Sequence, residues 1–308
     1  MAFDFYFAGG QSPEADNLIY ELNANRLLSY VNDRKLIESF WFNKKKQGWK
    51  GKLMIDSGAF TAHRKDLLLS IDDYCNWINA NYELFDYAIE LDDIPGKWGQ
   101  IKTVEQIKQS PINSWNNYLY MLSKVNCPDK ILPVFHQGEN FKYLEQMVNH
   151  QINGHYIKYI CISGNKELTG KQREAWYEKV FTIIKSSNNA NVKTHCLGSA
   201  TLSNIEMFPF TSMDATSWIM TAANGSIMTD YGIVFVSNNN LCDPNHINNM
   251  PEQAQEKIRQ YCNKYNIKLS DCSDNYKFRS LINIHYLFDK SKVVSFNTNI
   301  KFRKKGLF

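Results

Sequence analysis

Short apolar runs recur along the chain, and most are followed by a polar turn and then by a stretch with helical periodicity. Strands that alternate with helices in this way are typical of parallel β/α folds with right-handed crossovers. The pattern predicts strands at FDFYFA (3–8), KLMIDS (52–57), DYAIEL (86–91), ILPVFH (131–136), YIKYICIS (156–163), VKTHCL (192–197), FTSMD (210–214) and GIVFVS (232–237). Eight such strands predict an α/β fold, a (β/α)8 TIM-type barrel with extra C-terminal helices.

Helical periodicity is clearest in three of the intervening stretches, 71–82, 103–124 and 171–187. Pro111 is expected to break the second of them, because proline lacks an amide donor and clashes with the preceding turn. A doubly wound open sheet is the main competing fold, but no G-x-G-x-x-G follows an early strand. No linker divides the chain, so we expect a single barrel domain over 1–308, with its core at about 1–240 and a helical segment at about 241–308.

The chain of 308 residues is 44% hydrophobic and 14% aromatic, enough to bury a large core. Its N-terminus, MAFDFYF, lacks a signal-peptide pattern, and no apolar run approaches the roughly 20 residues of a membrane span. We therefore expect a cytoplasmic protein with no membrane partner. Abundant Asn, Lys and Ile suggest an AT-rich genome, and for a phage protein the compartment would be the host bacterial cytoplasm. Seven cysteines without a C-x-x-C pair predict reduced thiols.

The formal net charge is +4, from 35 Lys+Arg against 31 Asp+Glu. This excess is too small to predict nucleic-acid binding by itself. Cations and aromatics do cluster at FNKKKQGWKGK (42–52) and at KFRKKGLF (301–308). Each cluster fits phosphate contacts, and fits a solvated loop or tail equally well.

Polar residues stand where the predicted strands end, which is where barrel enzymes place their chemistry. They are Asp56, Asp92, Asp93, Gln137, Gly164 and Asp214. Taken singly, an aspartate after a strand is more often a turn former or a helix N-cap. The agreement among the positions instead predicts carboxylates that converge on one mouth. Two such carboxylates suit substitution at a sugar anomeric carbon, one as nucleophile and the other as proton donor and acceptor.

The motifs IDSGAFT, LDDIPG, VFHQG, CISG and HCLGSAT, followed by FTSMDATSW, occur in this order over residues 52–218. In order and spacing they resemble the tRNA-guanine transglycosylase superfamily, including its phage and bacterial DNA-modifying branch. The segment HCLGSATLSNIEMFPFTSMD is the most specific, since it is similar to the family's Leu-Gly turn and the helix leading to its nucleophilic aspartate. The resemblance implies a base exchange in which guanine leaves a nucleoside and a 7-deazaguanine replaces it.

Carried over by motif, Asp214 is the implied nucleophile at C1′ and Asp56 the implied general acid/base. Asp93, or Asp92 beside it, would bind the amino and ring N–H edge of the base, for which a carboxylate is a suitable acceptor. The other implied substrate-binding residues are Ser57, Gln137, Gly138, Gly164 and Gly198. Aromatics near the mouth, such as Phe60, Phe135 and Trp218, could sandwich the base, although core packing is the commoner role.

The sequence departs from the family at its zinc element, C-x-C-x-x-C with a distant histidine. Residues 270–288 keep one of the three cysteines, so we expect no cofactor and no metal. A rearranged zinc site remains possible, with ligands drawn from Cys242, Cys262 and Cys272 together with His246 and His285.

Two further departures favour DNA over tRNA as the partner. Trp218 stands near the place where the tRNA enzymes have basic residues, and no RNA-binding domain follows the barrel. A target guanine in DNA would have to leave the duplex stack to reach a barrel mouth. Phosphates would then be held by Lys44–Lys46, Lys301 and Arg303–Lys305.

Three alternatives stay open at this point. The first is the same exchange directed at tRNA. The second is a catalytically inactive barrel that binds nucleic acid or a small ligand, which predicts that Asp56 and Asp214 lie apart or pair with neighbouring cations. The third is glycoside hydrolysis, which uses the same carboxylates but favours a cleft lined with sugar-stacking aromatics.

Overall fold

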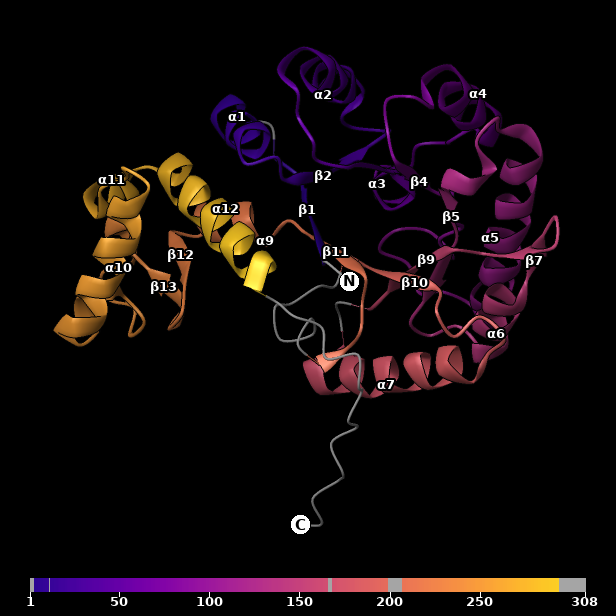
Figure 1. Ribbon diagram of the computed structural model, residues 1–308. Coiled ribbons are helices and arrows are strands. Elements are labelled where there is room, and N and C mark those ends of the chain that lie inside the picture. Colours follow the sequence, from indigo (N-terminus) through magenta and orange to yellow (C-terminus); the bar gives the residue numbers. More distant parts are fainter. Residues whose placement is uncertain (1–2, 11, 166–167, 199–206, 294–308) are drawn as a thin grey trace, which may run out of the picture. The chain divides into compact units, whose positions relative to one another are not determined.

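The computed structural model describes residues 3–10, 12–165, 168–198 and 207–293. These residues form two compact units (Figure 1). The first unit contains the described chain up to Tyr6 and Asn25–Asp214. The second contains Phe7–Ala24 and the described chain from Ala215 onward, so the expected boundary near residue 240 falls inside it.

The first unit is built on a ring of short strands, paired in the order β5-β4-β3-β2-β1-β11-β10-β9-β6. The strands are β1 (Asp4–Ala8), β2 (Asn25–Ser29), β3 (Leu53–Asp56), β4 (Tyr87–Ile89), β5 (Ile131–Leu132), β6 (Val134–His136), β9 (Tyr159–Ser163), β10 (Lys193–Leu197) and β11 (Ser212–Ala215). The two ends of the order, β5 and β6, are separated only by Pro133, so they share one strand position and the ring closes with eight positions. The fold is a TIM-type barrel, as the alternating pattern predicted.

Pro133 explains why this strand is divided. Proline has no amide N–H to give to a neighbouring strand, so the ladder is interrupted at this residue. The carbonyl of Pro133 still accepts a hydrogen bond from Cys161 N at 2.8 Å. The next amide, Val134 N, donates to the carboxyl of Glu90 at 2.6 Å instead of to a strand.

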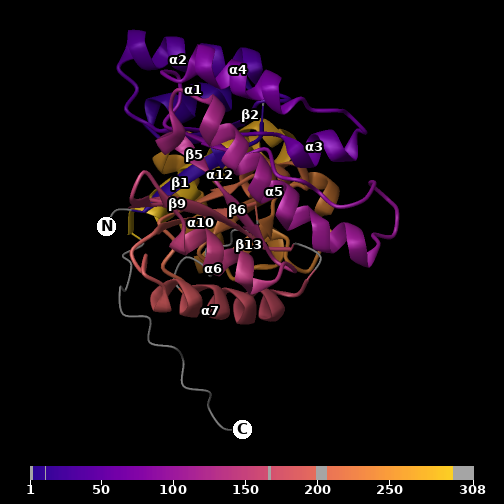
Figure 2. The ribbon, with the colours of Figure 1, turned by 90° about the vertical axis from the view of Figure 1, so that its right-hand side faces the viewer.

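Helices surround the ring on its outside in both ribbon views (Figures 1 and 2). They are α2 (Arg34–Gln47), α3 (Ala59–Arg64), α4 (Ile71–Asn81), α5 (Val104–Lys124), α6 (Phe141–Asn149) and α7 (Gly170–Ser186). A 3-10 turn, η1 (Pro128–Lys130), and a small hairpin of β7 (Gln151–Ile152) and β8 (His155–Tyr156) complete the unit. Side chains cap four of these helices at their first turn, from Ser70, Thr103, Asn140 and Thr169.

The expectation that Pro111 breaks its helix is wrong, because α5 runs unbroken past this residue. A capping box between Thr103 and Gln106 fixes the start of the helix. Beyond the first turn, Ser110 and Ser114 hydrogen-bond to the backbone of Asp93 and anchor the helix to the end of β4. These contacts compensate for the backbone hydrogen bond that proline removes.

Two strand predictions also need correction. The barrel strand β2 has the sequence NRLLS and was not predicted, because the run is short and contains Arg26, whose side chain is fully buried. The segment 232–237 is not a barrel strand. Its residues Gly232–Phe235 form β13, which pairs antiparallel with β12 (Ser226–Thr229) in the second unit.

The second unit is mainly helical around that hairpin. Its helices are α1 (Pro13–Glu21), α9 (Ser217–Ala223), α10 (Glu252–Lys264), α11 (Leu269–Asp274) and α12 (Tyr276–Val293), with 3-10 turns η2 (Asn238–Asn240) and η3 (Ile247–Asn249). Its core joins Ile227 and Val234 of the hairpin with Ile258, Cys262 and Ile282 of the helices. The buried Asn283 side chain ties α12 to Met228 N at 2.7 Å and to Trp218 O at 3.0 Å.

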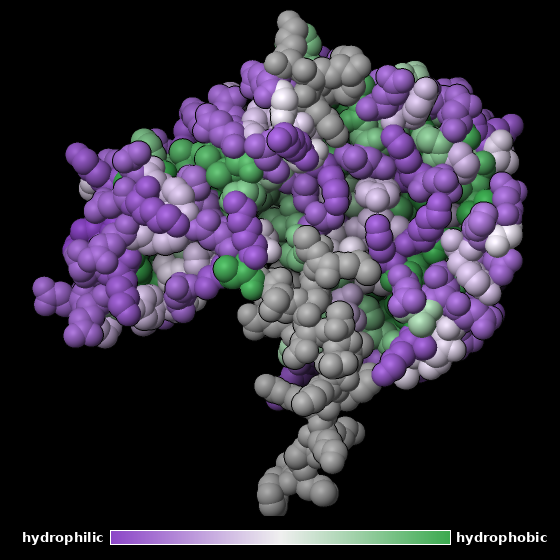
Figure 3. All heavy atoms as spheres, in the orientation of Figure 1, coloured by the Kyte–Doolittle hydropathy of each residue, from purple (hydrophilic) through white to green (hydrophobic). Residues whose placement is uncertain are grey.

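The face of the molecule drawn in Figure 3 carries mostly hydrophilic side chains. This agrees with helices that turn their apolar sides inward. Across the residues that the structure describes, no helix combines the length and apolar character that crossing a bilayer requires.

Candidate active site

Acidic and histidine side chains from several strands gather at the carboxyl ends of the barrel strands. Asp56 is the last residue of β3, and Asp214 belongs to β11. Asp92 follows β4, and His136 ends β6. Parallel strands of a closed barrel bring these ends to one mouth, which is the usual place of a barrel active site.

The loop after β3 holds Asp56 in place through its glycine. Gly58 has a φ of +80°, and a Cβ there would lie 2.5 Å from Val31 and 2.8 Å from the Ser29 hydroxyl, so only glycine fits. The turn directs the Gly58 amide at the Asp56 carboxylate. Ser57 between them is fully buried, and its hydroxyl accepts from Ala59 N at 3.4 Å. The I-D-S-G motif is thus a local device that presents Asp56.

The Asp56 carboxyl titrates far from its usual range. Burial raises its pKa, and the charges of Asp92 and Asp214 raise it further, to about 7, against the opposing effect of the Gly58 hydrogen bond. Asp92 and Asp214 are therefore close enough to Asp56 to act on its proton. A carboxyl with such a pKa can both give and take a proton at neutral pH.

Asp214 is held by one backbone amide and one histidine. Gly198 N donates to Asp214 Oδ1 at 2.7 Å, in a turn where Gly198 has a φ of +65°. The fully buried His195 places Nε2 3.3 Å from the same oxygen. The other ring nitrogen of His195 lies 2.5 Å from the Ser212 hydroxyl, which in turn contacts the Tyr159 hydroxyl. The Gly198 hydrogen bond fixes the Asp214 carboxylate, and the His195 ring lies against it at ion-pair distance without a hydrogen bond from Nε2.

A second ion cluster lies at the ends of β4 and β6. His136 Nε2 is 3.0 Å from Asp92 Oδ2, and His136 Nδ1 is 3.0 Å from Glu139 Oε1. Burial alone would lower the pKa of His136, but the two carboxylates outweigh it and raise the pKa to about 10. At neutral pH the imidazole is therefore a cation that orients both acids.

Of the neighbouring acids after β4, the structure brings Asp92 and not Asp93 to the other carboxylates. The carboxylate of Asp93 accepts from Asn113 Nδ2 of α5 at 3.2 Å. Its backbone is held by Ser110 and Ser114 of the same helix. The sequence analysis preferred Asp93 for base recognition with Asp92 as the alternative, and the geometry favours the alternative.

The buried Glu90 follows β4 and lies beside Ser114 of α5 and Met147 of α6, where its carboxyl accepts from Val134 N. Burial raises the pKa of Glu90 well above its usual range. Burial and then the charges of the neighbouring acids, among them Glu90, Asp214 and Asp56, raise the pKa of the Cys161 thiol as well.

The other predicted substrate-binding positions lie in the loops of the same face. Gln137 Oε1 accepts from Asn165 N at 2.9 Å, and Gln137 N donates to Ser163 O, so this side chain connects two strand-end loops. Gly138 is exposed and has a φ of +111° with open space where a Cβ would be. Gly164 is buried directly after β9.

The three proposed stacking aromatics differ in their surroundings. Phe135 is fully buried and stacks on Trp176, and Trp218 is fully buried in the second unit, where its indole N–H donates to Ala8 O at 2.9 Å. Both are core residues. Phe60, which is 56% exposed, meets the 54% exposed Trp98 edge to face at 5.5 Å. Phe60 belongs to α3, directly after β3, and Trp98 stands in the segment after β4, so this aromatic pair is available at the strand-end face.

Several other predicted positions do not belong to the strand-end site or lie outside the described residues. The side chains of Lys44–Lys46, the residues Lys301 and Arg303–Lys305, and the implied turn and helix over 199–206 lie outside the described part of the structure. Cys262 and Cys272 are buried next to each other, whereas Cys242 is exposed. Within the described ranges, no cluster of three or more His, Cys, Asp or Glu is arranged to hold a metal ion.

Sequence reasoning overlooked four residues of this site, namely Glu90, His136, Glu139 and His195. A signal was present in the strand pattern. His136 ends its predicted strand, and His195 and Glu90 interrupt otherwise apolar runs. A titratable residue inside a barrel strand has to be buried with a partner, and that requirement identifies it as a candidate.

Comparison with known proteins adds little to this geometry. No family model matches the sequence, and no curated protein matches it. The chain is similar to a solved structure described as "Native KDPGal structure", with 11% identity and a TM-score of 0.37 over 71% of this chain and 87% of that one. It is also similar to a cube-shaped, highly porous protein cage designed by fusing symmetric oligomeric domains, with 10% identity and a TM-score of 0.35 over 70% and 64%. Likenesses of this size carry no argument about activity.

Proposed function

We propose that this chain is a base-exchange glycosyltransferase, a pentosyltransferase that replaces guanine in DNA with a 7-deazaguanine derivative. The observation that carries the proposal is that Asp56, Asp92 and Asp214 share one mouth, where burial and then the charges of Asp92 and Asp214 raise the pKa of Asp56 to about 7. The inactive-barrel alternative expects Asp56 and Asp214 to lie apart or to pair with neighbouring cations. The coupling between the two carboxyls argues against separation, although Asp214 does have a histidine partner.

Asp214 is the nucleophile in this proposal. Its carboxylate attacks C1′ of the target nucleotide and forms an aspartyl-glycosyl bond while the C1′–N bond to guanine breaks. Positive charge develops at the sugar as the base departs, and the surrounding carboxylates stabilise it. The Gly198 amide and His195 keep the attacking carboxylate oriented.

Asp56 is the proton donor to the leaving base and the proton acceptor from the incoming base. In the first half-reaction its neutral carboxyl gives a proton to the leaving guanine. In the second, its carboxylate accepts the proton of the incoming 7-deazaguanine, whose nitrogen attacks C1′ and releases Asp214. Protons and bonds balance over the cycle, and no other cofactor is required by these steps. A pKa of about 7 keeps both forms of Asp56 populated at neutral pH.

Asp92 is the base-recognition carboxylate in this scheme. The amino and ring N–H groups of guanine are adjacent donors, and a carboxylate can accept from both. His136 and Glu139 hold Asp92 in its orientation. Gln137 and the backbone at Gly138 and Gly164 are placed in the neighbouring loops to serve the carbonyl side of the base.

The family resemblance and the exposed aromatic pair support a nucleic-acid substrate. Phe60 and Trp98 can stack on a base next to the flipped nucleotide, a contact worth about 1–3 kcal/mol per base. DNA is preferred to tRNA for the sequence reasons given above. Exchange into tRNA is the alternative, and the incorporation experiment distinguishes the two.

The test is incorporation of labelled guanine and of labelled 7-deazaguanine bases into DNA and into tRNA, side by side. We expect label in DNA with the wild-type protein and none with Asp214→Ala. Asp129→Asn is the matched control, because Asp129 is 84% exposed and precedes β5 at the opposite end of the strand. Label in tRNA alone would replace the DNA proposal by the tRNA one. Label in neither would favour the inactive barrel.

A further inference from the structure

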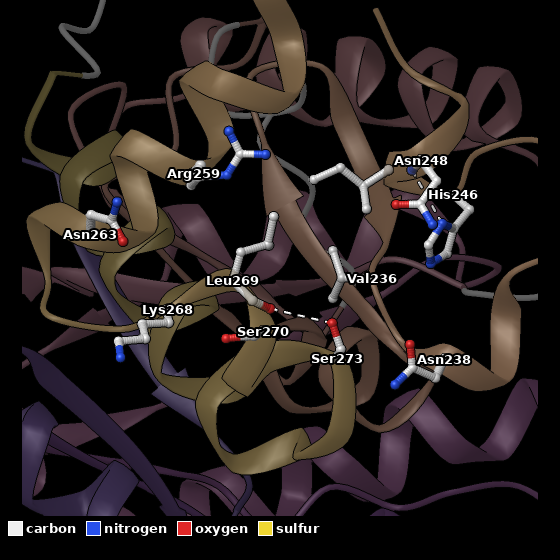
Figure 4. A pocket seen from close by; sticks show the side chains of 11 residues that line it. Val236, Asn238, His246, Asn248, Arg259, Asn263, Lys268, Leu269, Ser270 and Ser273 are labelled. Atoms are coloured by element: carbon white, nitrogen blue, oxygen red, sulfur yellow. Dashed lines mark hydrogen bonds between the residues drawn. The ribbon is translucent and has the colours of Figure 1, made fainter. Parts of the chain in front are cut away.

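A separate pocket lies in the second unit, far along the chain from the strand-end acids. Its volume is about 370 Å³, within the range of small-molecule sites. Figure 4 shows its lining, which comes from the segment after β13, from α10 and from the start of α11. None of its eleven lining residues is acidic, although the chain as a whole is nearly balanced in charge.

The lining divides into an apolar floor and a polar rim. Val236, Ile247 and Leu269 supply the apolar surface. Around them stand the amides of Asn248 and Asn263 with further Asn and Ser side chains (Figure 4). Amide groups can donate to and accept from the edges of a heterocycle, and an apolar floor suits its flat face.

His246 contributes a buried donor that lacks a partner. The side chain is 2% exposed and lines the pocket. Asn248 N donates to its Nδ1 at 3.2 Å, so the neutral ring carries its proton on Nε2. That Nε2 has no hydrogen-bond partner among the described residues. Because this nitrogen is enclosed by protein, the pocket borders the His246 ring and not its unpartnered donor.

Two cations stand on the rim. Arg259 of α10 and Lys268, which precedes α11, both line the pocket. Three nearby carboxylates are outside the lining: Glu256 pairs with Arg259 one turn earlier on α10, Asp271 accepts from Lys268 N, and Asp274 accepts from Asn238. A phosphate on the rim would compete with Glu256 for the Arg259 guanidinium, which suits bidentate binding of phosphate.

We propose that this pocket binds one nucleotide, either free or as a unit of a nucleic-acid strand. The phosphate lies against Arg259 and Lys268, and the base lies over the apolar floor, within reach of the rim amides and beside the His246 ring. A lone phosphate would leave most of the volume and the apolar floor unused. The site is independent of the exchange chemistry proposed for the barrel.

The experiment is calorimetric titration with the four 5′-mononucleotides, with inorganic phosphate and with a short single-stranded oligonucleotide. The double variant Arg259→Gln/Lys268→Gln removes the rim cations without touching the core. Lys257→Gln is the matched control, since Lys257 is an exposed cation on the same helix but outside the pocket. We expect the double variant to bind at least about tenfold more weakly, and the control to bind as the wild type does.

The ligand series separates the sources of the phosphate. Binding of a mononucleotide that depends on the two cations supports a free ligand, and dependence seen only with the oligonucleotide supports a strand. Inorganic phosphate that binds as tightly as any nucleotide would overturn the role of the base. Equal affinity of the double variant and the wild type for every ligand would overturn the site.

A second measurement follows the His246 ring by NMR. Saturating nucleotide should shift the ring signals of His246, because the ligand lies against a ring that lines the pocket. An unchanged ring signal with a ligand that does bind would place that ligand elsewhere. Asp214→Ala protein should behave as the wild type in both measurements, so a failure of the exchange proposal and a failure of the nucleotide site are distinguishable.

Discussion

The strand-end site of the first unit and the pocket of the second unit have opposite chemistry. The first collects carboxylates near strand ends, beside the half-buried His136 and the buried His195. The second collects cations, amides and one unpartnered histidine around an apolar floor. An acidic mouth stabilises developing positive charge and accepts from N–H donors, whereas the second pocket suits an anion. The net charge of +4 does not reveal this contrast between an acidic site and a cationic pocket.

The largest expected effect comes from removing the proposed nucleophile of the strand-end site. Asp214→Asn should lower base exchange by about 10⁴-fold or more, because an amide cannot form the glycosyl ester. The wild type should also form an enzyme–nucleic acid adduct that survives denaturation, and the variant should not. An adduct that persists in Asp214→Asn would show that another residue attacks the sugar. Nucleotide binding in the second unit should stay unchanged.

Asp56→Asn should reduce exchange by about 10²–10⁴-fold, the usual contribution of a general acid/base. The wild-type rate should change with pH around 7, where Asp56 titrates, and that inflection should be absent in the variant. The measurement is the pH profile of kcat with labelled base. A profile with the same inflection in both proteins would assign the proton transfer to another group.

His136→Gln should weaken exchange by about 10²-fold, since Asp92 loses the cation that orients it. The loss should fall mainly on KM for the free base, because recognition and not bond breaking is affected. His136 has its pKa raised from 6.5 to about 10, so its stabilising pairing is complete below pH 6.5 and is lost as the pH rises through 10. The stability gap between variant and wild type should therefore narrow at high pH, which thermal unfolding at two pH values can measure.

Nucleotide binding in the second unit should depend on the salt concentration. Nucleotide binding there should weaken as salt rises, and Lys268→Gln alone should weaken it about tenfold at low salt with a flatter salt dependence. Lys257→Gln should leave the affinity and its salt dependence unchanged. Titrations at three salt concentrations measure both, and identical slopes in Lys268→Gln and wild type would remove this residue from the site.

The smallest expected effect concerns stability. The pKa of Asp56 is raised on folding from 3.8 to about 7, so the ionised carboxylate opposes folding above pH 7 and is harmless below pH 3.8. Asp56→Asn should therefore unfold at a higher temperature than the wild type at pH 8, by a few degrees. The gain should shrink at pH 5. A gain of the same size at both pH values would show that charge is not its origin.

The sequence predicted the barrel because the alternation of apolar runs and helical stretches is a local pattern that does not depend on tertiary contacts. It missed β2 because Arg26 interrupts a five-residue strand, and it assigned 232–237 to the barrel because a hairpin strand and a barrel strand have the same local pattern. Periodicity reports which residues are apolar, not which strands pair.

The candidate site was predictable only in part, for a related reason. Asp56 ends β3 and Asp214 is the next-to-last residue of β11, so the barrel fold alone brings both to the mouth. The choice between Asp92 and Asp93 depends on contacts with α5 and β6, which are distant in sequence. Glu90 and His195 are buried in strands, and their partners come from other strands. Partners of this kind are set by tertiary packing and leave no local trace.

The interruption at Pro133 gives the Asp92–His136 contact a second role. Asp92 follows β4, which pairs with β5 before the proline, and His136 ends β6 after it. The ion pair, together with the Glu90 bond to Val134, thus spans the seam where main-chain pairing lapses. If Asp92 recognises the base as proposed, the same side chains also close the barrel at Pro133, so variants that change the preferred base would also weaken this part of the scaffold.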